Sequence, residues 1–178
     1  MAEPLIPKHG GYRRLITYRL GMLIYDATVA FCARYIDRRD RTHDQMVQAA
    51  RSGVANIVEG SEAAATSKKT ELKLTNVAKA SQEELLFDYQ AFLQQYHLPE
   101  CPPECAESLT VRQARPADLA RLRNLMAVLV SNQSDKSDRK AEVAANVMIC
   151  IINHRENPIG LRLTTSEVSS IMADYARA

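Results

Sequence analysis

The chain of 178 residues contains no tryptophan, only six glycines and seven prolines, and no long apolar run. So few glycines and prolines argue against a fold rich in tight turns and favour helices. The densest apolar stretch, residues 147–152, is far shorter than the roughly 18 residues of a membrane span, so no membrane partner is expected. Residues 1–14 also lack the hydrophobic core of a signal peptide, and nothing in them directs export.

Motifs of catalysis and cofactor binding are absent as well. The sequence has no glycine-rich phosphate loop and no nucleophile elbow, and the adjacent carboxylates of Glu83 and Glu84 point to different faces of a helix. We therefore expect no enzyme activity, no catalytic residue, no cofactor and no metal. Four cysteines without a regular framework indicate reduced thiols in a cytoplasmic protein, with Cys32 and Cys150 as small core residues.

One spacing leaves an alternative open for the remaining two cysteines. His97, Cys101 and Cys105 follow one another at four-residue intervals, and His43 or His154 could supply a fourth zinc ligand. Structural zinc sites usually show tighter cysteine pairs, however, so this spacing is weak support. The competing interpretation is that Cys101 and Cys105 are incidental residues of a proline-rich loop.

The remaining composition is typical of a globular domain, with 46% hydrophobic and 25% charged residues. Apolar positions recur at three- and four-residue steps, and this period predicts helices. The chain length suits one domain, residues 1–178, with an N-terminal extension (1–16) and a C-terminal suffix (157–178). The expected helices span residues 17–36, 42–60, 67–96, 116–129 and 138–154, followed by a short one at 164–175.

Local signals set the expected helix boundaries. Thr42 and Gln45 have capping-box spacing, and Gly60 is expected to stop the second helix. Gly53 inside that helix indicates close approach of a neighbour. Three prolines exclude regular helix from residues 97–115, and Pro116 is expected to open the next helix. The predicted fold is an all-α, up-down antiparallel four-helix bundle with a short additional C-terminal helix.

Basic residues concentrate near the start of the chain. Residues 1–41 carry eight basic side chains against four acidic ones, although the whole chain has a net charge of only +2. Such a cluster either contacts nucleic-acid phosphates or forms a solvated face that pairs with acidic residues. The candidate nucleic-acid contacts are Arg13, Arg14, Arg19, Arg38, Arg39 and Arg41.

A polar motif accompanies the second and third expected helices. Asn56 and Glu59 lie one helical turn apart, and a hydrogen-bonded network there would set the register between two helices. The alternative is a polar contact surface for a partner. The residues of this motif are Asn56, Glu59, Gly60, Ser81 and Glu84.

These residues resemble a bacterial four-helix-bundle family encoded in intervening sequences of 23S ribosomal RNA genes. The family pattern Asn-Ile-x-Glu-Gly corresponds to residues 56–60, and its Ser-x-x-Glu-Leu corresponds to residues 81–85. The similarity extends over residues 17–95, and the C-terminal suffix is closest to a longer subgroup. The resemblance implies a homo-oligomeric ring, commonly a pentamer. One relative is the accessory protein of diversity-generating retroelements, which binds nucleic acid and a reverse transcriptase.

Together these observations predict a non-catalytic oligomeric scaffold or accessory protein that binds itself and a protein or RNA partner. The alternative function is a nucleic-acid-binding accessory protein of a reverse-transcriptase system.

Overall fold

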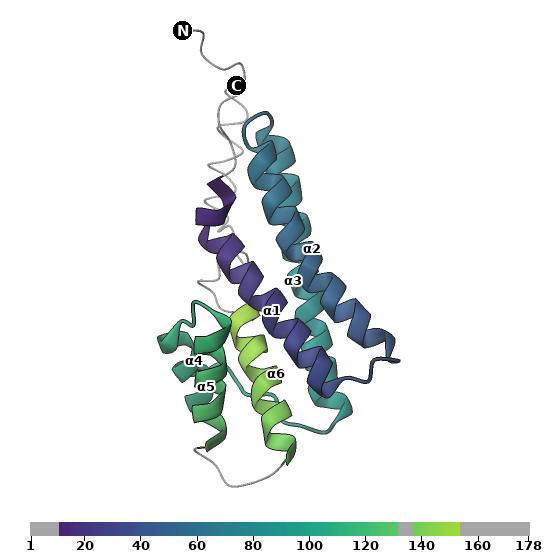
Figure 1. Cartoon of the computed structure of the whole chain (residues 1–178), viewed down its shortest axis with the longest axis vertical. Helices are drawn as coiled ribbons and strands as arrows, with labels where there is room; N and C mark the ends of the chain where they lie inside the picture. Colours follow the sequence, from purple (N-terminus) through teal and green to yellow (C-terminus); the bar gives the residue numbers. More distant parts are fainter. Residues whose placement is uncertain (1–10, 132–136, 154–178) are drawn as a thin grey trace.

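The computed structural model describes residues 11–131 and 137–153, and all regular elements in these ranges are helical. The prediction of an all-α fold is therefore confirmed. The expected helix at 164–175 lies outside the described residues. A short 3-10 helix, η1 (Gly11–Arg14), is followed by α1 (Ile16–Tyr35), α2 (Arg41–Ala63), α3 (Lys68–Gln95), α4 (Ala106–Ala114), α5 (Leu119–Ser131) and α6 (Ser137–Asn153) (Figure 1).

The four longest helices, α1, α2, α3 and α6, form an up-down bundle. Going along the chain, α1, α2, α3 and α6 alternate in direction (Figure 1). Helix α2 contacts α1 and α3, and α6 contacts the same two helices from the other side. The edge formed by α1 and α6 therefore lies opposite the edge formed by α2 and α3. Helices α4 and α5 contact α6 and each other, and they sit outside this arrangement.

The core lies where apolar side chains of the packed helices meet. Phe31 of α1 makes edge-on ring contacts with Tyr89 and Phe92 of α3, at centroid distances of 4.9 Å each. The hydroxyl of Tyr89 donates a hydrogen bond to Thr28 Oγ1 at 3.0 Å, so the one polar atom of this ring is satisfied. The apolar residues 147–152 of α6 are all buried within the chain, between α1, α3, α4 and α5.

The first three helices match their predicted ranges closely, but two boundary signals were wrong. Helix α2 begins at Arg41, and its N-cap is Asp40, whose carboxylate accepts the Thr42 N–H at 2.9 Å. The Thr42–Gln45 capping box is therefore not used. Gly60 does not stop α2, which continues to Ala63. A Cβ at Gly60 would lie 3.4 Å from Leu74 Cβ, so the glycine serves close packing against α3.

The second half of the chain departs further from the prediction. The expected break at residues 97–115 contains helix α4, because all three prolines precede its first residue, Ala106. Pro116 does not open α5, which begins at Leu119. Asp118 caps α5 instead, since its Oδ1 accepts the Arg121 N–H at 2.8 Å.

Candidate functional site

The predicted polar motif forms a small hydrogen-bonded network between α2 and α3. Asn56 Nδ2 donates to Ser52 O at 2.8 Å and lies 3.2 Å from Ser52 Oγ. Ser81 Oγ donates to the same Ser52 hydroxyl at 3.0 Å, across the helix pair. Ser52, which the sequence interpretation missed, therefore joins the two predicted residues. Glu59 and Glu84 are exposed and lie outside this network.

Directly beside this network, a buried amide packs against the glycine in the middle of α2. Gln82 is 4% exposed, and its Nε2 lies 2.1 Å from the position that a Cβ at Gly53 would occupy. Gly53 thus leaves room for a partner helix, as predicted. Neither amide atom of Gln82 has a hydrogen-bond partner among the described residues. An unpaired buried amide costs stability, so Gln82 is a polar feature that the sequence pattern did not reveal.

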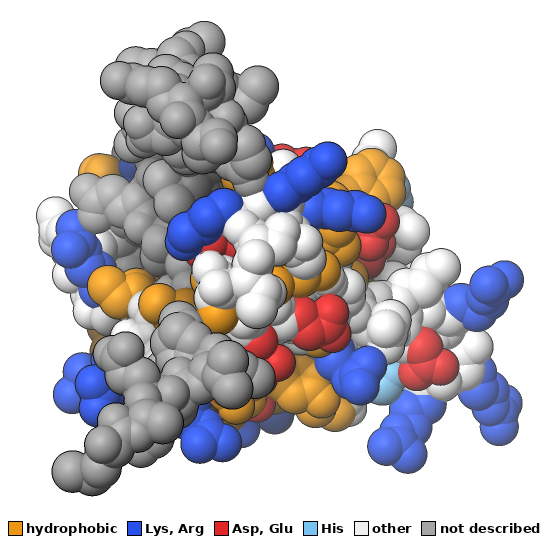
Figure 2. Space-filling model, turned by 90° about the horizontal axis from the view of Figure 1, so that it is seen from above, with side chains coloured by type: hydrophobic (Ala, Val, Ile, Leu, Met, Phe, Trp, Pro, Cys, Tyr) orange, Lys and Arg blue, Asp and Glu red, His pale blue; other side chains and the backbone are white. Residues whose placement is uncertain are grey.

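The structure divides the predicted basic surface into two separate groups. Arg13, Arg14 and Arg19 lie at or near the start of α1, and Arg38, Arg39 and Arg41 lie at its other end. A helix of 20 residues is about 30 Å long, so the groups are roughly that far apart. On the face seen in Figure 2, Lys and Arg side chains are scattered among acidic and apolar ones.

A groove with an apolar floor runs between α1, α5 and α6. Its lining includes the cations Arg34, Arg123 and Lys140, and none of its lining residues in the described part of the chain is acidic. This basic groove was not predicted, because its three cations come from three different helices. Its floor is lined by Phe31, Leu122, Met126, Val130, Ala144 and Met148.

The opposite edge of the bundle carries a hollow of the opposite charge, between α2 and α3. Arg41 is the only cation among the described residues that line this acidic face. Phe87 projects from the face with 69% of its surface exposed. Partial burial and, secondarily, the charge of Glu84 raise the pKa of Asp88. The four carboxylates of the acidic face are Asp44, Glu83, Glu84 and Asp88.

A third cluster forms where the loop before α4 meets α6. Cys101 and Cys105 are joined by a disulfide, so the prediction that these cysteines are reduced, incidental loop residues is wrong. Sequence spacing could not show this pairing, because it depends on how the turn through Pro102 and Pro103 folds. Cys32 and Cys150 are free and buried, as predicted.

The structure also changes the set of residues that could bind zinc. Glu107, not His97, shares the cluster with the two cysteines, and the donor atoms of the three side chains lie within 4.8 Å of one another. His97 is exposed in the turn after α3, with a φ of 53°. His43 lies at the start of α2, where its Nδ1 is 3.3 Å from Asp44 Oδ1. His154 lies outside the described residues.

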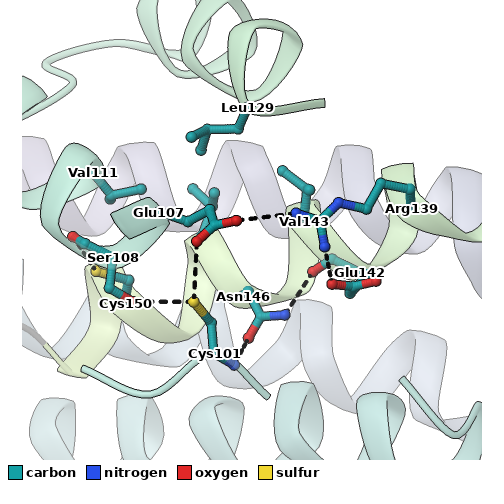
Figure 3. Close-up of a pocket in the computed structure, with 11 residues that line it drawn as sticks. Cys101, Glu107, Ser108, Val111, Leu129, Arg139, Glu142, Val143, Asn146 and Cys150 are labelled. Carbon is teal, nitrogen blue, oxygen red and sulfur yellow. Dashed lines mark hydrogen bonds and ion pairs between the residues drawn. The ribbon is translucent and has the colours of Figure 1, made fainter. Parts of the chain in front are cut away.

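Side chains of α6 hold the cysteine cluster in place (Figure 3). Asn146 Oδ1 accepts the Cys101 N–H at 2.6 Å, and Asn146 Nδ2 donates to Pro99 O at 2.9 Å. Arg139 pairs with Glu107 at 3.1 Å and also with Glu142. Figure 3 shows the Glu107 carboxylate between the Arg139 guanidinium and Cys101 Sγ.

The fold and these surfaces define a class, that of all-α helical-bundle proteins. Comparisons with protein-family models, with curated proteins and with solved structures found no match. Among the described residues, no helix combines the length and apolar character needed to span a bilayer.

Proposed function

We propose that this chain is a non-catalytic helical scaffold that assembles head to tail with further copies of itself and holds a protein or RNA partner. The observation that carries the proposal is the complementarity of two surfaces on opposite edges of the bundle. The basic groove contributes three cations around an apolar floor. The acidic face contributes four carboxylates around the exposed ring of Phe87.

Placing these surfaces on opposite edges favours a ring or a filament. When one patch of a subunit binds a different patch of the next, the interface is heterologous, and a suitable rotation closes it into a ring. Opposite charges guide the two patches together and select their register, while a buried aromatic side chain supplies most of the affinity. The family resemblance adds the expectation of a pentamer.

Charge reversal tests the head-to-tail contact directly. We expect Arg123→Glu in the groove and Glu84→Lys on the acidic face each to abolish association, measured by light scattering across micromolar concentrations. Lys69→Glu, an exposed charge reversal at the start of α3, is the matched control and should leave the mass unchanged. A wild-type chain that stays at 19.9 kDa at all concentrations would contradict the proposal.

Combining the two charge reversals tests whether the basic groove binds the acidic face. When Arg123→Glu and Glu84→Lys chains are combined, each altered groove meets an altered face of opposite charge, and the remaining contacts are wild type. The double variant by itself should therefore recover the wild-type mass. The mixture should regain association, but it cannot close an odd-numbered ring such as a pentamer, because the two chains cannot alternate all the way round. Recovery in neither sample would mean that these two surfaces do not meet.

The alternative proposal is a nucleic-acid-binding accessory protein of a reverse-transcriptase system. The exposed arginines at both ends of α1 support it, because phosphate contacts need accessible cations. Tyr12 and Tyr18 lie beside the first group, with ring centroids 5.0 Å apart, and Arg13 stacks over Tyr12. Such rings could also receive unpaired bases.

The separation of the two arginine groups makes this alternative testable in parts. We expect each triple substitution to glutamate, at Arg13, Arg14 and Arg19 or at Arg38, Arg39 and Arg41, to weaken binding of a single-stranded RNA and to reduce its salt dependence. Fluorescence anisotropy at several salt concentrations measures both. Binding that neither triple substitution changes would eliminate this function.

A further inference from the structure

We propose that Cys101, Cys105 and Glu107 form a zinc site in the reduced protein, and that the Cys101–Cys105 disulfide closes the site by oxidation. Two thiolates and a carboxylate are ligands that Zn²⁺ prefers. Their donor atoms lie within 4.8 Å of one another, and opening the disulfide would let its two sulfurs separate to the spacing that a tetrahedral ion requires. Water would occupy the fourth position.

Each ligand is held in position by a separate contact. The Cys101 N–H is fixed to α6 by Asn146 Oδ1 at 2.6 Å. Cys105 is the N-cap of α4, and its Sγ accepts the Ser108 N–H at 3.2 Å. Arg139 binds Oε1 of Glu107, while Oε2 of the same carboxylate lies 3.9 Å from Cys101 Sγ. This resembles the outer shell that orients metal ligands.

The surroundings suit a divalent cation bound to two thiolates. Two thiolates and a carboxylate carry three negative charges, and Glu142, which also pairs with Arg139, adds a fourth; Zn²⁺ and Arg139 together offset three of the four. The Ser108 hydroxyl lies 3.7 Å from Cys101 Sγ and can donate to that sulfur. A cavity of about 30 Å³ adjoins Cys101 and Glu107, and this volume is sufficient for a water molecule.

Reduction of the disulfide and binding of zinc are two separate steps, and atoms and charges balance in each. Two equivalents of a thiol reductant convert the disulfide to two thiols and leave with one disulfide bond between them. Zinc then displaces one proton from each cysteine, and Glu107 binds in its ionised form. Oxidation by a disulfide reverses the sequence and releases the ion, because the sulfurs of a disulfide do not bind zinc as thiolates do.

Cobalt titration of the reduced full-length chain tests the site. With the metal-free chain kept reduced by a phosphine, one equivalent of Co²⁺ should give thiolate-to-cobalt absorption and the visible bands of a tetrahedral ion. Binding of Co²⁺ should release two protons, one from each cysteine. One equivalent of Zn²⁺ should then displace the cobalt and remove both signals without further proton release. The oxidised chain should show none of these signals.

Substitutions assign the ligands. Cys101→Ser and Cys105→Ser should each weaken cobalt binding and reduce the sulfur-to-cobalt absorption, because one thiolate remains in each variant. Replacing both cysteines should abolish the absorption, and serine preserves the cap of α4 at residue 105. Glu107→Gln should weaken zinc binding about tenfold or more, and Arg139→Gln should weaken it by a similar factor through the outer shell. Cys32→Ala is the matched control, because it removes a buried thiol on α1 and should leave metal binding unchanged. Far-ultraviolet circular dichroism establishes that each variant is folded.

Three results would overturn the proposal. The first is a reduced, folded chain that shows no sulfur-to-cobalt absorption. The second is absorption of undiminished intensity in folded Cys101→Ser, and the third is metal binding by the oxidised chain that equals binding by the reduced chain. The site shares no residue with the basic groove or the acidic face, so its failure leaves the head-to-tail assembly untouched.

Discussion

At the scale of single residues, Gly53 and Gln82 are coupled across the α2–α3 pair. We predict that Gly53→Ala stabilises the wild-type chain by less than the helix propensity of alanine offers, because its Cβ would lie 2.1 Å from Gln82 Nε2 and the buried side chain would have to move. In a Gln82→Ala background the same change should stabilise it by about 1 kcal/mol, the helix propensity of alanine over glycine. Urea unfolding of the four proteins in this double-mutant cycle measures the coupling. Gly60→Ala, which does not approach Gln82, should behave alike in both backgrounds.

Cys32 makes the stability of the fold sensitive to alkaline pH. Burial, and then the charge of Asp88, raise the pKa of the Cys32 thiol from 9.0 to about 12. Between these values the unfolded chain loses the proton and the folded chain keeps it, so stability falls as the pH rises through this window. The loss approaches about 1.4 kcal/mol per pH unit.

Unfolding curves between pH 8 and 10 test this alkaline effect. The slope of unfolding free energy against pH should be shallower in Cys32→Ala than in the wild type. Met46→Leu, which changes the sulfur next to Cys32 without removing a titrating group, should keep the wild-type slope. Equal slopes in all three proteins would contradict the assignment to Cys32.

At the scale of elements, sequence periodicity was sufficient for α1, α2 and α3 but not for α4 and α5. The long helices each carry several turns of apolar residues, so the period is unambiguous. Helix α4 has only 9 residues, and it was not predicted because the three prolines before it indicated a break over the whole of residues 97–115. Helix α5 begins three residues after Pro116 because Asp118 supplies the cap.

The cap of α5 gives a prediction for this element. Asp118→Ala should destabilise the protein by about 1 kcal/mol, because the Arg121 N–H loses its acceptor. Asp118→Asn should retain nearly wild-type stability, since asparagine caps as well as aspartate does. Chemical denaturation measures both variants. If alanine and asparagine were equally tolerated, the carboxylate would have no role in starting α5.

At the scale of the whole molecule, the proposed assembly depends on charge and therefore on pH. The raised pKa of Asp88 means that this carboxylate is protonated before an ordinary aspartate as the pH falls. Each protonation removes charge from the acidic face, so we predict that association weakens as the pH falls and that the weakening begins at a higher pH than an ordinary aspartate would give. Sedimentation over a series of falling pH values measures the change.

A matched variant separates Asp88 from general acid effects. Asp88→Asn is neutral at every pH, so it should associate more weakly than the wild type at pH 7.5 and lose less association on acidification. An identical pH response in the wild type and Asp88→Asn would exclude Asp88 as the source. High salt should weaken the wild-type assembly as well, because it screens exposed charges.

Local pattern by itself determined the helical class of this protein, the extents of its first three helices, the burial of Cys32 and Cys150, and the need for space at Gly53. Those properties depend on residues within a few turns of one another. Only the tertiary structure decided that Ser52 joins Asn56 to Ser81, that Glu107 replaces His97 beside the cysteines, and that three helices contribute cations to one groove. Each of these depends on distances between segments far apart in the chain, which spacing along the sequence does not encode.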